Sequence, residues 1–329
     1  MTKLSSSDNH KAFQECASKR FISVCVRFTS KRSVSCFGAL NLHYVFLKEE
    51  DFDTVYGTFV KAFSDYQIEM KITKEQFKEM NVRRGLSYEL SAGAVDDRGK
   101  MVGLALNGAD FWDKKLTAYD MGTGVVPEFR GKGVADGMFD FLIPKLRQSG
   151  LKQYLLEVIR SNEKAYNLYK KKGFRETRQF ECFTAEVASL NLENTIDAED
   201  GISIKPMEMP EWSLFESFWE WRPSARARSV DSVKRSQSRK VVLGAFKGSR
   251  CVGYGIIFSE SGDIPQFAVK ETFRRRGVGT LLMKALAREA RRGRLAVVNV
   301  DSSSQITLDF LTDLGFKNFA GQYEMVLEL

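Results

Sequence analysis

Residues 124–139 read GVVPEFRGKGVADGMF, and residues 267–282 read FAVKETFRRRGVGTLL. Each stretch joins a run of strand formers to a basic, glycine-containing loop and then to a helical pattern. A helix N-terminus presents unpaired N–H groups and a partial positive charge, and glycine lets the backbone approach an anion closely. Each loop is therefore predicted to hold a pyrophosphate. The loops lack the GK[ST] ending of a P-loop and the G-x-G-x-x-G spacing of dinucleotide-binding folds.

The elements around the two loops recur in the same order, which indicates an internal duplication. Gly133 corresponds to Gly277 at an offset of 144 residues, and Gly173 corresponds to Gly315 at an offset of 142. A length of 329 residues also suggests two domains. We expect domain 1, the candidate catalytic domain, at 41–187, an Asn- and acid-rich linker at 188–201, and domain 2 at 202–329.

Alternating strand and helix patterns fill both halves, with an early helix after the acidic run that begins at Glu49. In the first half, strands are expected at 42–46, 117–126, 154–159 and 178–187, a hairpin around 97–99, and helices at 136–150 and 161–174. In the second half, strands are expected at 201–207, 264–269, 295–300 and 323–329, a hairpin at 240–258, and helices at 211–221, 280–293 and 304–316.

The first 40 residues differ in composition from the rest of the chain. They hold seven Lys and Arg residues but only two acids, so they carry most of the net charge of +8. Because this stretch is also rich in serine, it is expected to be either a disordered leader or a transit peptide. The expected location is cytoplasmic, or mitochondrial in the second case. The two halves are nearly neutral, so a nucleic-acid-binding surface is not expected.

Cysteine and histidine are too few to suggest metal or disulfide chemistry. The chain has five Cys, an odd number without a C-x-x-C pair, and only two His. We therefore expect no metal site and a reducing compartment. No apolar run approaches the roughly 18 residues of a membrane span, so no membrane partner is expected.

A longer pattern surrounds the first loop and gives it a family resemblance. Some forty residues after the loop, the chain reads N-x-x-A-x-x-L-Y-x-x-x-G-F from Asn162 to Phe174. Together with the pattern [R/Q]-x-x-G-x-[G/A], this resembles the GCN5-related N-acetyltransferase (GNAT) superfamily. The resemblance covers about 41–187 and, more weakly, 202–329. It implies an α/β architecture: two tandem domains, each a splayed mixed β-sheet flanked by helices.

The resemblance also implies a role for each motif residue, with acetyl-CoA as the co-substrate. The backbone of the strand before the loop, at Val125 and Val126, would pair with the pantetheine amides. Asn162 would contact the cofactor arm, and Tyr169 would protonate the departing thiolate. The pyrophosphate would be held by the loop amides of Gly131, Lys132, Gly133, Val134 and Ala135. The other expected cofactor-binding residues are Arg130 and, in the second half, Val269, Arg274, Arg275, Arg276, Gly277, Val278 and Gly279.

Catalysis is expected in the first half, because alignment places Leu311 opposite Tyr169 and Ser304 opposite Asn162. The second half is expected to bind CoA without turnover or to be a structural and substrate-forming partner. Asp120 and Glu157 lie on the strand before the loop and on the next strand, so both are candidate bases. A salt-bridged structural role is the alternative for each of them.

Each of two unusual segments in the second half has two interpretations. The aromatic residues between Trp212 and Trp221 are expected to pack in the core, with a substrate wall as the alternative. The basic, Ser-rich stretch from Arg222 to Arg239 is expected to be a solvated loop, with a lid over an acidic ligand as the alternative.

The predicted function is an acyl-CoA-dependent N-acyltransferase that transfers acetyl from acetyl-CoA to the primary amine of a small molecule by direct attack. The alternatives are a protein Lys or N-terminal acetyltransferase and a non-catalytic CoA-binding scaffold. The expected state is a monomer or a homodimer, since a tandem chain can supply a pseudo-dimer interface by itself.

Overall fold

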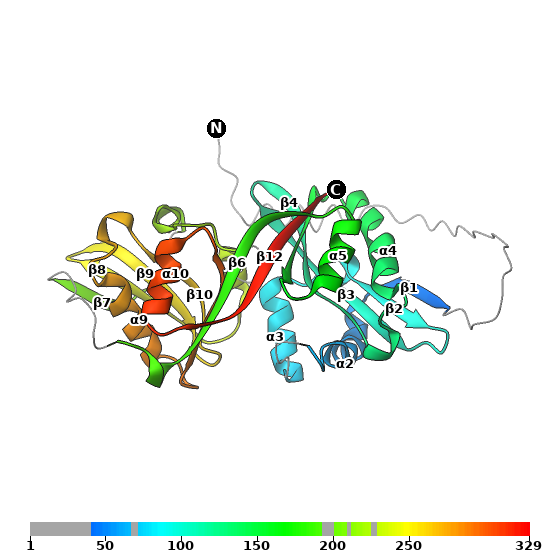
Figure 1. Ribbon diagram of the computed structural model, residues 1–329, viewed down its shortest axis with the longest axis horizontal. Coiled ribbons are helices and arrows are strands. Elements are labelled where there is room, and N and C mark those ends of the chain that lie inside the picture. The colour runs from blue at the N-terminus through cyan, green and yellow to red at the C-terminus, as the bar shows by residue number, and fades with distance from the viewer. Residues whose placement is uncertain (1–40, 67–71, 193–200, 209–211, 225–228) are drawn as a thin grey trace. The chain divides into compact units, whose positions relative to one another are not determined.

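The computed structural model describes residues 41–66, 72–192, 201–208, 212–224 and 229–329 (Figure 1). The expected leader at 1–40 and most of the expected linker lie outside the described residues. In the described part of the chain, no helix is long and apolar enough to cross a membrane.

The first half alternates strands and helices largely where the sequence predicts them. An additional helix, α3, begins at a capping box, in which the Thr73 hydroxyl and the Gln76 side chain each accept a backbone N–H, and ends at Gly85 with φ 69°. The elements are β1 (Leu42–Phe46), α2 (Phe52–Ala62), α3 (Lys74–Arg84), β2 (Ala92–Asp96), β3 (Met101–Trp112), β4 (Lys115–Val125), α4 (Val134–Gln148), β5 (Gln153–Ile159), α5 (Glu163–Lys171) and β6 (Arg175–Glu186).

The second half repeats this order with a shorter first helical segment. The helix expected at 211–221 is wrong in length, because the chain forms only four residues of α-helix and a three-residue 3₁₀ turn, Glu216–Phe218. The elements are β7 (Ile202–Pro206), α6 (Trp212–Phe215), α8 (Val230–Arg235), β8 (Lys240–Lys247), β9 (Arg250–Phe258), β10 (Asp263–Val269), α9 (Val278–Arg288), β11 (Arg294–Asp301), α10 (Gln305–Asp313) and β12 (Lys317–Glu328).

The two halves exchange their last strands. The twelve strands run in the order β1-β2-β3-β4-β5-β12-β6-β11-β10-β9-β8-β7. The C-terminal β12 therefore pairs with β5 of the first half, and β6 pairs with β11 of the second, as the crossing of the green and red strands in Figure 1 shows. Phe183 and Ala185 of β6 consequently belong to the hydrophobic core of the second half.

Each half opens a notch in its sheet beside the glycine loop. Strands β4 and β5 run parallel but pair only from Thr117–Tyr119 to Gln153–Leu155. Strands β10 and β11 are parallel as well, and their register holds the single pair Asp263 and Ala296. Past these pairs, among the described strands, β5 is hydrogen-bonded only to its antiparallel neighbour β12, and β11 only to its antiparallel neighbour β6. The expected mixed, splayed sheet is confirmed, and each notch leads to one loop.

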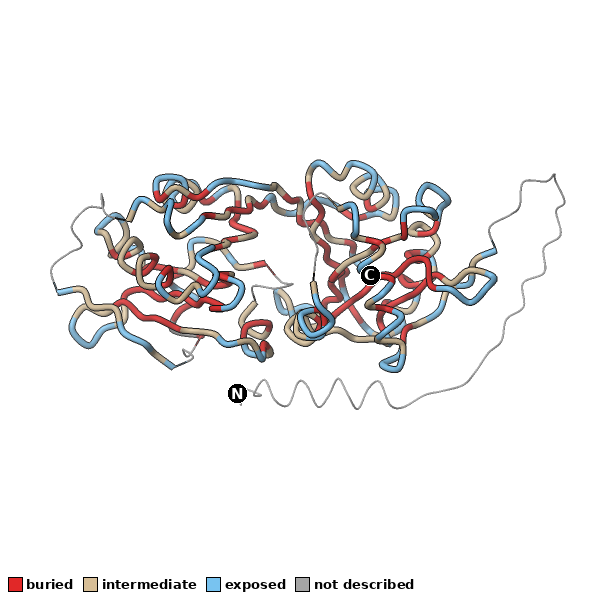
Figure 2. The backbone as a smooth tube through the Cα atoms, turned by 90° about the horizontal axis from the view of Figure 1, so that it is seen from below, coloured by how far each residue is buried: buried red, intermediate tan, exposed pale blue. Residues whose placement is uncertain are grey.

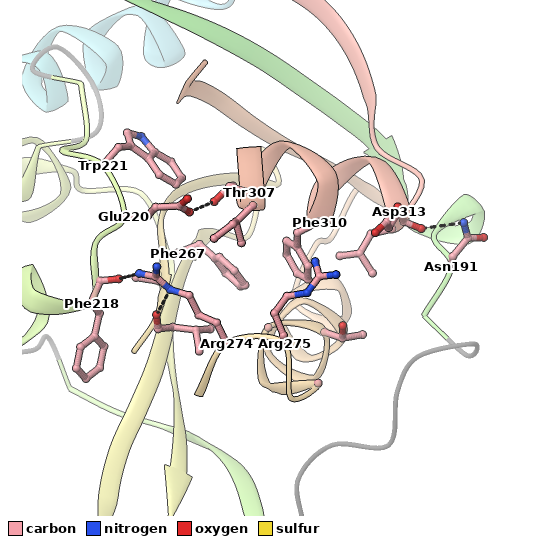
Figure 3. A pocket seen from close by; sticks show the side chains of 17 residues that line it. Asn191, Phe218, Glu220, Trp221, Phe267, Arg274, Arg275, Thr307, Phe310 and Asp313 are labelled. Atoms are coloured by element: carbon pink, nitrogen blue, oxygen red, sulfur yellow. Dashed lines mark hydrogen bonds between the residues drawn. The ribbon is translucent and has the colours of Figure 1, made fainter. Parts of the chain in front are cut away.

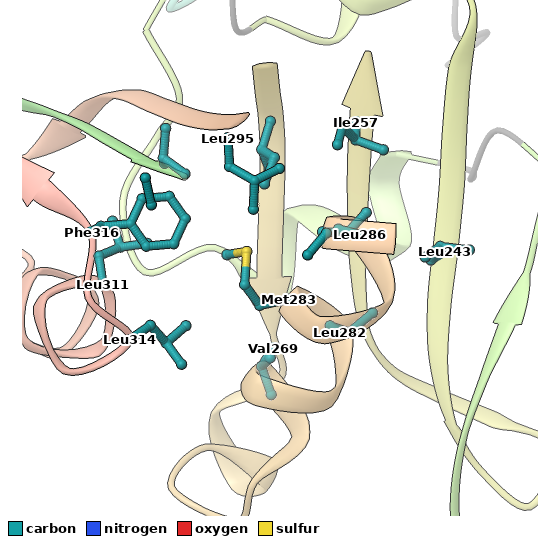
Figure 4. Close-up of a cluster of buried hydrophobic side chains, with 14 of the residues drawn as sticks. Leu243, Ile257, Val269, Leu282, Met283, Leu286, Leu295, Leu311, Leu314 and Phe316 are labelled. Carbon is teal, nitrogen blue, oxygen red and sulfur yellow. The ribbon is translucent and has the colours of Figure 1, made fainter. Parts of the chain in front are cut away.

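Buried residues, red in Figure 2, lie along the strands and on the helices packed on them. In the second half, Leu282, Met283 and Leu286 of α9 point toward the sheet, where they meet Leu295 and Ile257 (Figure 4). This spacing of three and four residues places one apolar stripe of α9 against the core. The orientation of α9 fixes the position of its N-terminus, where the second glycine loop ends.

Polar contacts also join α3 and β3 of the first half to β10 and the segment around α8 of the second half. The Arg235 guanidinium donates to the Asp110 carboxylate at 2.7 Å, and Arg83 donates to Asp263 at 2.9 Å. The Glu79 carboxylate accepts hydrogen bonds from both Ser236 and Ser238. The described part of the basic segment therefore includes a short helix fixed to the first half, which differs from the solvated loop expected there.

Candidate functional site

The first arginine of each loop organises the backbone around it. The Arg130 Nε donates to the Val125 carbonyl oxygen at 3.0 Å, and the Arg274 Nε donates to the Val269 carbonyl oxygen at 3.0 Å. A second guanidinium nitrogen donates to the end of the preceding helical segment, at Ala62 in the first half and at Phe218 in the second. Both arginines thus hold strand, loop and helical segment in one arrangement.

Residues with positive φ angles form both loops, just before the following helix begins. Gly133 is the N-cap of α4 with φ 76°, and Gly277 is the N-cap of α9 with φ 74°. Two residues earlier, Gly131 has φ 72° and its counterpart Arg275 has φ 61°, which is a rare angle for a residue with a side chain. Among the described residues, no side chain caps either helix. The first N–H groups of α4 and α9 are thus placed for an anion.

The remaining loop residues divide between the core and the surface. Val134 and Val278 are buried at the first turn of their helices. Lys132 lies over the Phe129 ring at 5.2 Å, and Arg276 lies over the Phe273 ring at 5.8 Å. Both loops therefore present cationic side chains next to an aromatic ring. Ala135 is half-buried at the first turn of α4.

The backbone of Val126 is already engaged within the chain. Its N–H donates to the Val102 carbonyl oxygen at 2.9 Å, and its own carbonyl oxygen accepts the Phe129 N–H at 2.9 Å. Because an N–H makes one strong hydrogen bond, the pairing with pantetheine that the resemblance places at Val126 has no donor there. Val125 remains the candidate for that pairing.

A cavity of about 470 Å³ lies beside the second loop (Figure 3). It is bounded by α9 on one side and α10 on the other, and Arg274 and Arg275 enter it from the loop. The stacked rings of Phe267 and Phe310, 5.6 Å apart, form part of its wall. Gly277 and Gly279 also line it, together with Asn191, Phe218, Glu220, Trp221, Ala268, Val269, Thr280, Ile306, Thr307, Asp313 and Leu314.

A carboxylate stands in the wall of this cavity. Glu220 accepts a hydrogen bond from the Thr307 hydroxyl of α10 at 2.8 Å, and Trp221 lies next to it (Figure 3). This contact ties the segment after Phe218 to α10. In the aromatic segment, Trp212 and Phe215 pack in the core, as expected, whereas Trp221 lines a cavity, and a substrate wall there stays a prediction.

In the first half, ion pairs cross the corresponding space between α4 and α5. The counterparts of Thr280, Asp313 and Leu314 are Asp136, Lys171 and Lys172. The Asp136 carboxylate lies 3.0 Å from the Lys171 Nζ and 3.1 Å from the Lys172 Nζ. Lys172, whose side chain is 8% exposed, also lies 2.6 Å from Asp140. These lysine–aspartate pairs, here called the α4–α5 clasp, span the gap that is open in the second half.

The α4–α5 clasp shifts the ionisation of its members. The hydrogen bond from Lys171 is the main reason that the pKa of Asp136 lies below its usual value of 3.8. For Lys172, burial works against the charge, but the bonds to Asp140 and Asp136 more than offset it and leave the pKa raised. Asp136 and Lys172 are therefore both charged near neutral pH, which keeps the clasp closed.

Tyr169 is largely buried in an aromatic cluster on the inner side of α5. Its ring meets Phe139 edge-on at 5.5 Å and lies 5.8 Å from Phe174. The helix begins at Asn162, whose side-chain oxygen accepts the Ala165 N–H at 3.3 Å and so acts as a cap. The packing seen here is that of a core aromatic, and the roles implied for Tyr169 and Asn162 stay predictions.

The two candidate bases both have structural surroundings. Asp120 is buried at a β-bulge of β4, where its carboxylate accepts the Gly122 N–H and the Thr123 hydroxyl, each at 2.7 Å. Glu157 on β5 faces Glu324 of β12 in the strand register. Burial is the largest single effect on the pKa of Arg178 and lowers it, but the neighbouring carboxylates, Glu157 among them, raise it overall. Catalysis by either acid stays a prediction.

The second half departs from the motif at two buried positions. Leu311, opposite Tyr169, belongs to the hydrophobic core, and Ser304, opposite Asn162, is the N-cap of α10. Within the described residues, the Ser304 hydroxyl makes no capping hydrogen bond. The cavity therefore lies in the half that lacks the phenol.

The two halves of the continuous sheet are thus built alike, each splayed beside a glycine loop at a helix N-terminus. The model of the acetyltransferase (GNAT) family matches residues 52–174 and again 207–316. These two regions cover more than half of the chain, which therefore belongs to the GNAT family. The tandem architecture predicted from the internal duplication is confirmed.

Solved structures of low sequence identity share this tandem fold. A tandem GNAT protein from the clavulanic acid biosynthesis pathway is 15% identical, with a TM-score of 0.68 over 88% of this chain and 98% of that one. A GCN5-related N-acetyltransferase from Sphaerobacter thermophilus is 15% identical, with a TM-score of 0.64 over 87% and 95%. The fungal glucosamine N-acetyltransferase region of a multi-domain GH3 β-N-acetylglucosaminidase is 18% identical, with a TM-score of 0.66 over 88% and 38%. At these identities, the likeness concerns the fold.

Several cavity residues escaped the sequence-based prediction. Glu220, Thr307 and Phe310 belong to no motif of the loop, although the offset of 142 residues places Phe310 opposite Leu168 of the first motif. That correspondence is the one signal that could have marked α10 as a wall. The described residues contain no group of three or more His, Cys, Asp or Glu side chains that could hold a metal ion.

Proposed function

We propose that this protein transfers acetyl from acetyl-CoA to the primary amine of a small molecule, and that the coenzyme lies in the cavity between α9 and α10. The observation that carries the proposal is this cavity, which opens at a glycine loop and helix N-terminus of the kind that binds pyrophosphate. Its position between two helices, next to the loop, suits the pantetheine arm, and its apolar rings suit an uncharged chain.

Charge also favours the second loop. Arg130 is neutralised by Asp65, whose oxygens lie 2.6 and 2.7 Å from the guanidinium nitrogens. Among the described residues, no ion pair is found for Arg274, whose guanidinium donates to the Val269 and Phe218 carbonyl oxygens, and Arg275 also lines the cavity. The second loop therefore offers more positive charge to a diphosphate than the first does.

The reaction needs an amine nitrogen with a free electron pair. That nitrogen attacks the thioester carbonyl carbon, a C–N bond forms, and the C–S bond breaks so that sulfur leaves with the electron pair. The Glu220 carboxylate in the cavity wall is placed to take the ammonium proton, directly or through water. Because Leu311 stands in the place of Tyr169, the thiolate takes its proton from solvent, and the acylated nitrogen releases its remaining extra proton to solvent to give the neutral amide.

A protein amino group as acceptor and a CoA-binding scaffold without turnover remain the competing functions. A cavity of about 470 Å³ between two helices favours a small acceptor over a protein surface. Catalysis by Tyr169 in the first half is the competing location, and the α4–α5 clasp argues against it because the space beside the first loop is bridged.

Thiol release with a panel of small primary amines tests this proposal. Wild type, Gly133→Glu and Gly277→Glu form a matched set, since both glycines have the same position and nearly the same φ. We expect amine-dependent release of CoA by wild type and Gly133→Glu, and at least a tenfold loss in Gly277→Glu. The reverse order would move catalysis to the first half. Binding of CoA without amine-dependent release from any member of the panel would favour the scaffold.

A further inference from the structure

A second, smaller chamber adjoins the coenzyme cavity. It measures about 40 Å³ and shares Glu220, Trp221, Phe267 and Thr307 with the larger cavity. Its other walls come from β10 and β11, just past the point where these strands pair. The chamber thus occupies the notch of the sheet, beyond the end of the space assigned to the pantetheine arm.

Two apolar side chains close the chamber on its inner side. Met283 of α9 and Leu311 of α10 both line it, and both are nearly inaccessible to solvent. Their counterparts in the first half are Phe139 and Tyr169, whose rings are in edge-on contact at 5.5 Å. The second half therefore has smaller and more flexible side chains where the first half has two packed rings.

The size of the chamber limits what can enter it. One water-sized group needs about 10–15 Å³ of such volume, so about 40 Å³ admits roughly three to four heavy atoms. An acetyl group has three heavy atoms, and a propionyl group has four. Longer chains would have to displace Met283 or Leu311 from a close-packed core, which is costly.

We propose that this chamber receives the acyl group of the donor and restricts the protein to acyl-CoA esters of two or three carbons, with Met283 and Leu311 as the residues that set the limit. The inference rests on the proposed function, because it requires the coenzyme to lie between α9 and α10. It explains why the position of the phenol carries leucine in this half.

Calorimetric titration of the full-length protein with CoA, acetyl-CoA, propionyl-CoA and hexanoyl-CoA tests the limit directly. We expect acetyl-CoA and propionyl-CoA to bind at least as tightly as CoA, and hexanoyl-CoA to bind at least tenfold more weakly than acetyl-CoA. Equal affinity for hexanoyl-CoA and acetyl-CoA would overturn this inference and leave the proposed function intact. No binding of CoA itself would overturn both.

Variants of the chamber residues provide a second test. We expect Met283→Ala to bring hexanoyl-CoA within about threefold of acetyl-CoA, because the chamber becomes deeper. Leu286→Ala is the matched control, since Leu286 is as buried and lies on the same helix but lines neither cavity. If Leu286→Ala relaxed the selectivity equally, general loosening of the core would be the cause and the inference would be wrong.

The reverse substitution covers the case in which Met283→Ala does not fold. Leu311→Tyr gives the second half the ring found in the first, so we expect it to bind CoA like wild type but acetyl-CoA at least tenfold more weakly than CoA. Retained preference for acetyl-CoA in a folded Leu311→Tyr would show that the acyl group lies elsewhere.

Discussion

Arg130 and Arg274 lie 144 residues apart and make the same hydrogen bond, since each Nε donates to the carbonyl oxygen of a valine five residues earlier at 3.0 Å. Each also reaches the end of a preceding helical segment. The difference is the carboxylate of Asp65, which pairs with Arg130. The duplicated loops therefore share a scaffold and differ in the charge that they offer to an anion.

The shared scaffold predicts that Arg274→Met weakens binding as well as folding. Loss of the two backbone hydrogen bonds should lower the free energy of unfolding by about 1–3 kcal/mol. We also expect at least a fivefold loss of affinity for CoA, because the loop shape and one positive charge are lost. Thermal unfolding and calorimetry measure the two effects.

Arg130→Met is the control for this prediction. It should lower stability by a similar amount but change the affinity for CoA less than twofold. An affinity loss in Arg130→Met that equals or exceeds that in Arg274→Met would contradict the assignment of the coenzyme to the second half.

The α4–α5 clasp predicts that the space between α4 and α5 can be opened to CoA by substitution. Replacing Asp136, Lys171 and Lys172 by their second-half counterparts, as Asp136→Thr, Lys171→Asp and Lys172→Leu, removes every ion pair of the clasp. We expect the triple variant to bind a second molar equivalent of CoA by calorimetry, where wild type binds one. A stoichiometry that stays at one in a folded triple variant would show that other contacts close the groove.

The clasp also gives the stability a pH dependence. The pKa of Asp136 is below 3.8 in the folded protein, so its contribution is present above about pH 4 and lost as the pH falls through the folded value. The raised pKa of Lys172 keeps its contribution until the pH rises above about 10.5. Lys172→Met should therefore cost about 1–2 kcal/mol at pH 7 and much less at pH 2.5, as urea unfolding would measure. An equal cost at both pH values would mean that packing, and not charge, is lost.

Exchange of the last strands predicts that the two halves unfold together. Arg178 of β6 and Glu324 of β12 form a two-point ion pair, with N–O distances of 2.9 and 2.6 Å, inside the shared sheet. Glu324→Leu leaves Arg178 without this partner and should destabilise the protein by about 3 kcal/mol in one transition. Scanning calorimetry that resolved separate transitions for the two halves would contradict a cooperative sheet.

The buried position of Tyr169 predicts a small catalytic effect. Tyr169→Phe keeps the ring contacts with Phe139 and Phe174, so we expect turnover within about twofold of wild type in the thiol-release assay. A loss of more than tenfold, without a change in stability, would return catalysis to the first half.

Local patterns were enough to predict the loops, most strands and the duplication. Gly133 and Gly277 both have a positive φ, which strongly favours glycine, so these positions can be recognised in the sequence. Helix α3 was missed although Thr73 and Gln76 form a capping box, because its apolar periodicity is weak. The helix expected at 211–221 was too long, since aromatic residues suit a core as well as a helix.

The features that decide function depend on contacts between distant residues. Strands β6 and β12 have similar buried and exposed patterns, so neither sequence indicates which half it joins. The clasp likewise joins Asp136 to lysines 35 and 36 residues later, and each of these residues alone would pass for a surface charge. Which groove is open therefore could not be predicted from the motifs, which favour the half that contains Tyr169.

Calorimetric titration of acetyl-CoA into wild type, Gly133→Glu and Gly277→Glu tests the location of the coenzyme most directly. Each substitution places bulk and a negative charge at a loop predicted to hold pyrophosphate. We predict one binding site in wild type, nearly unchanged binding in Gly133→Glu, and no measurable binding in Gly277→Glu. Loss of binding in Gly133→Glu with binding retained in Gly277→Glu would contradict the assignment of the coenzyme to the cavity between α9 and α10.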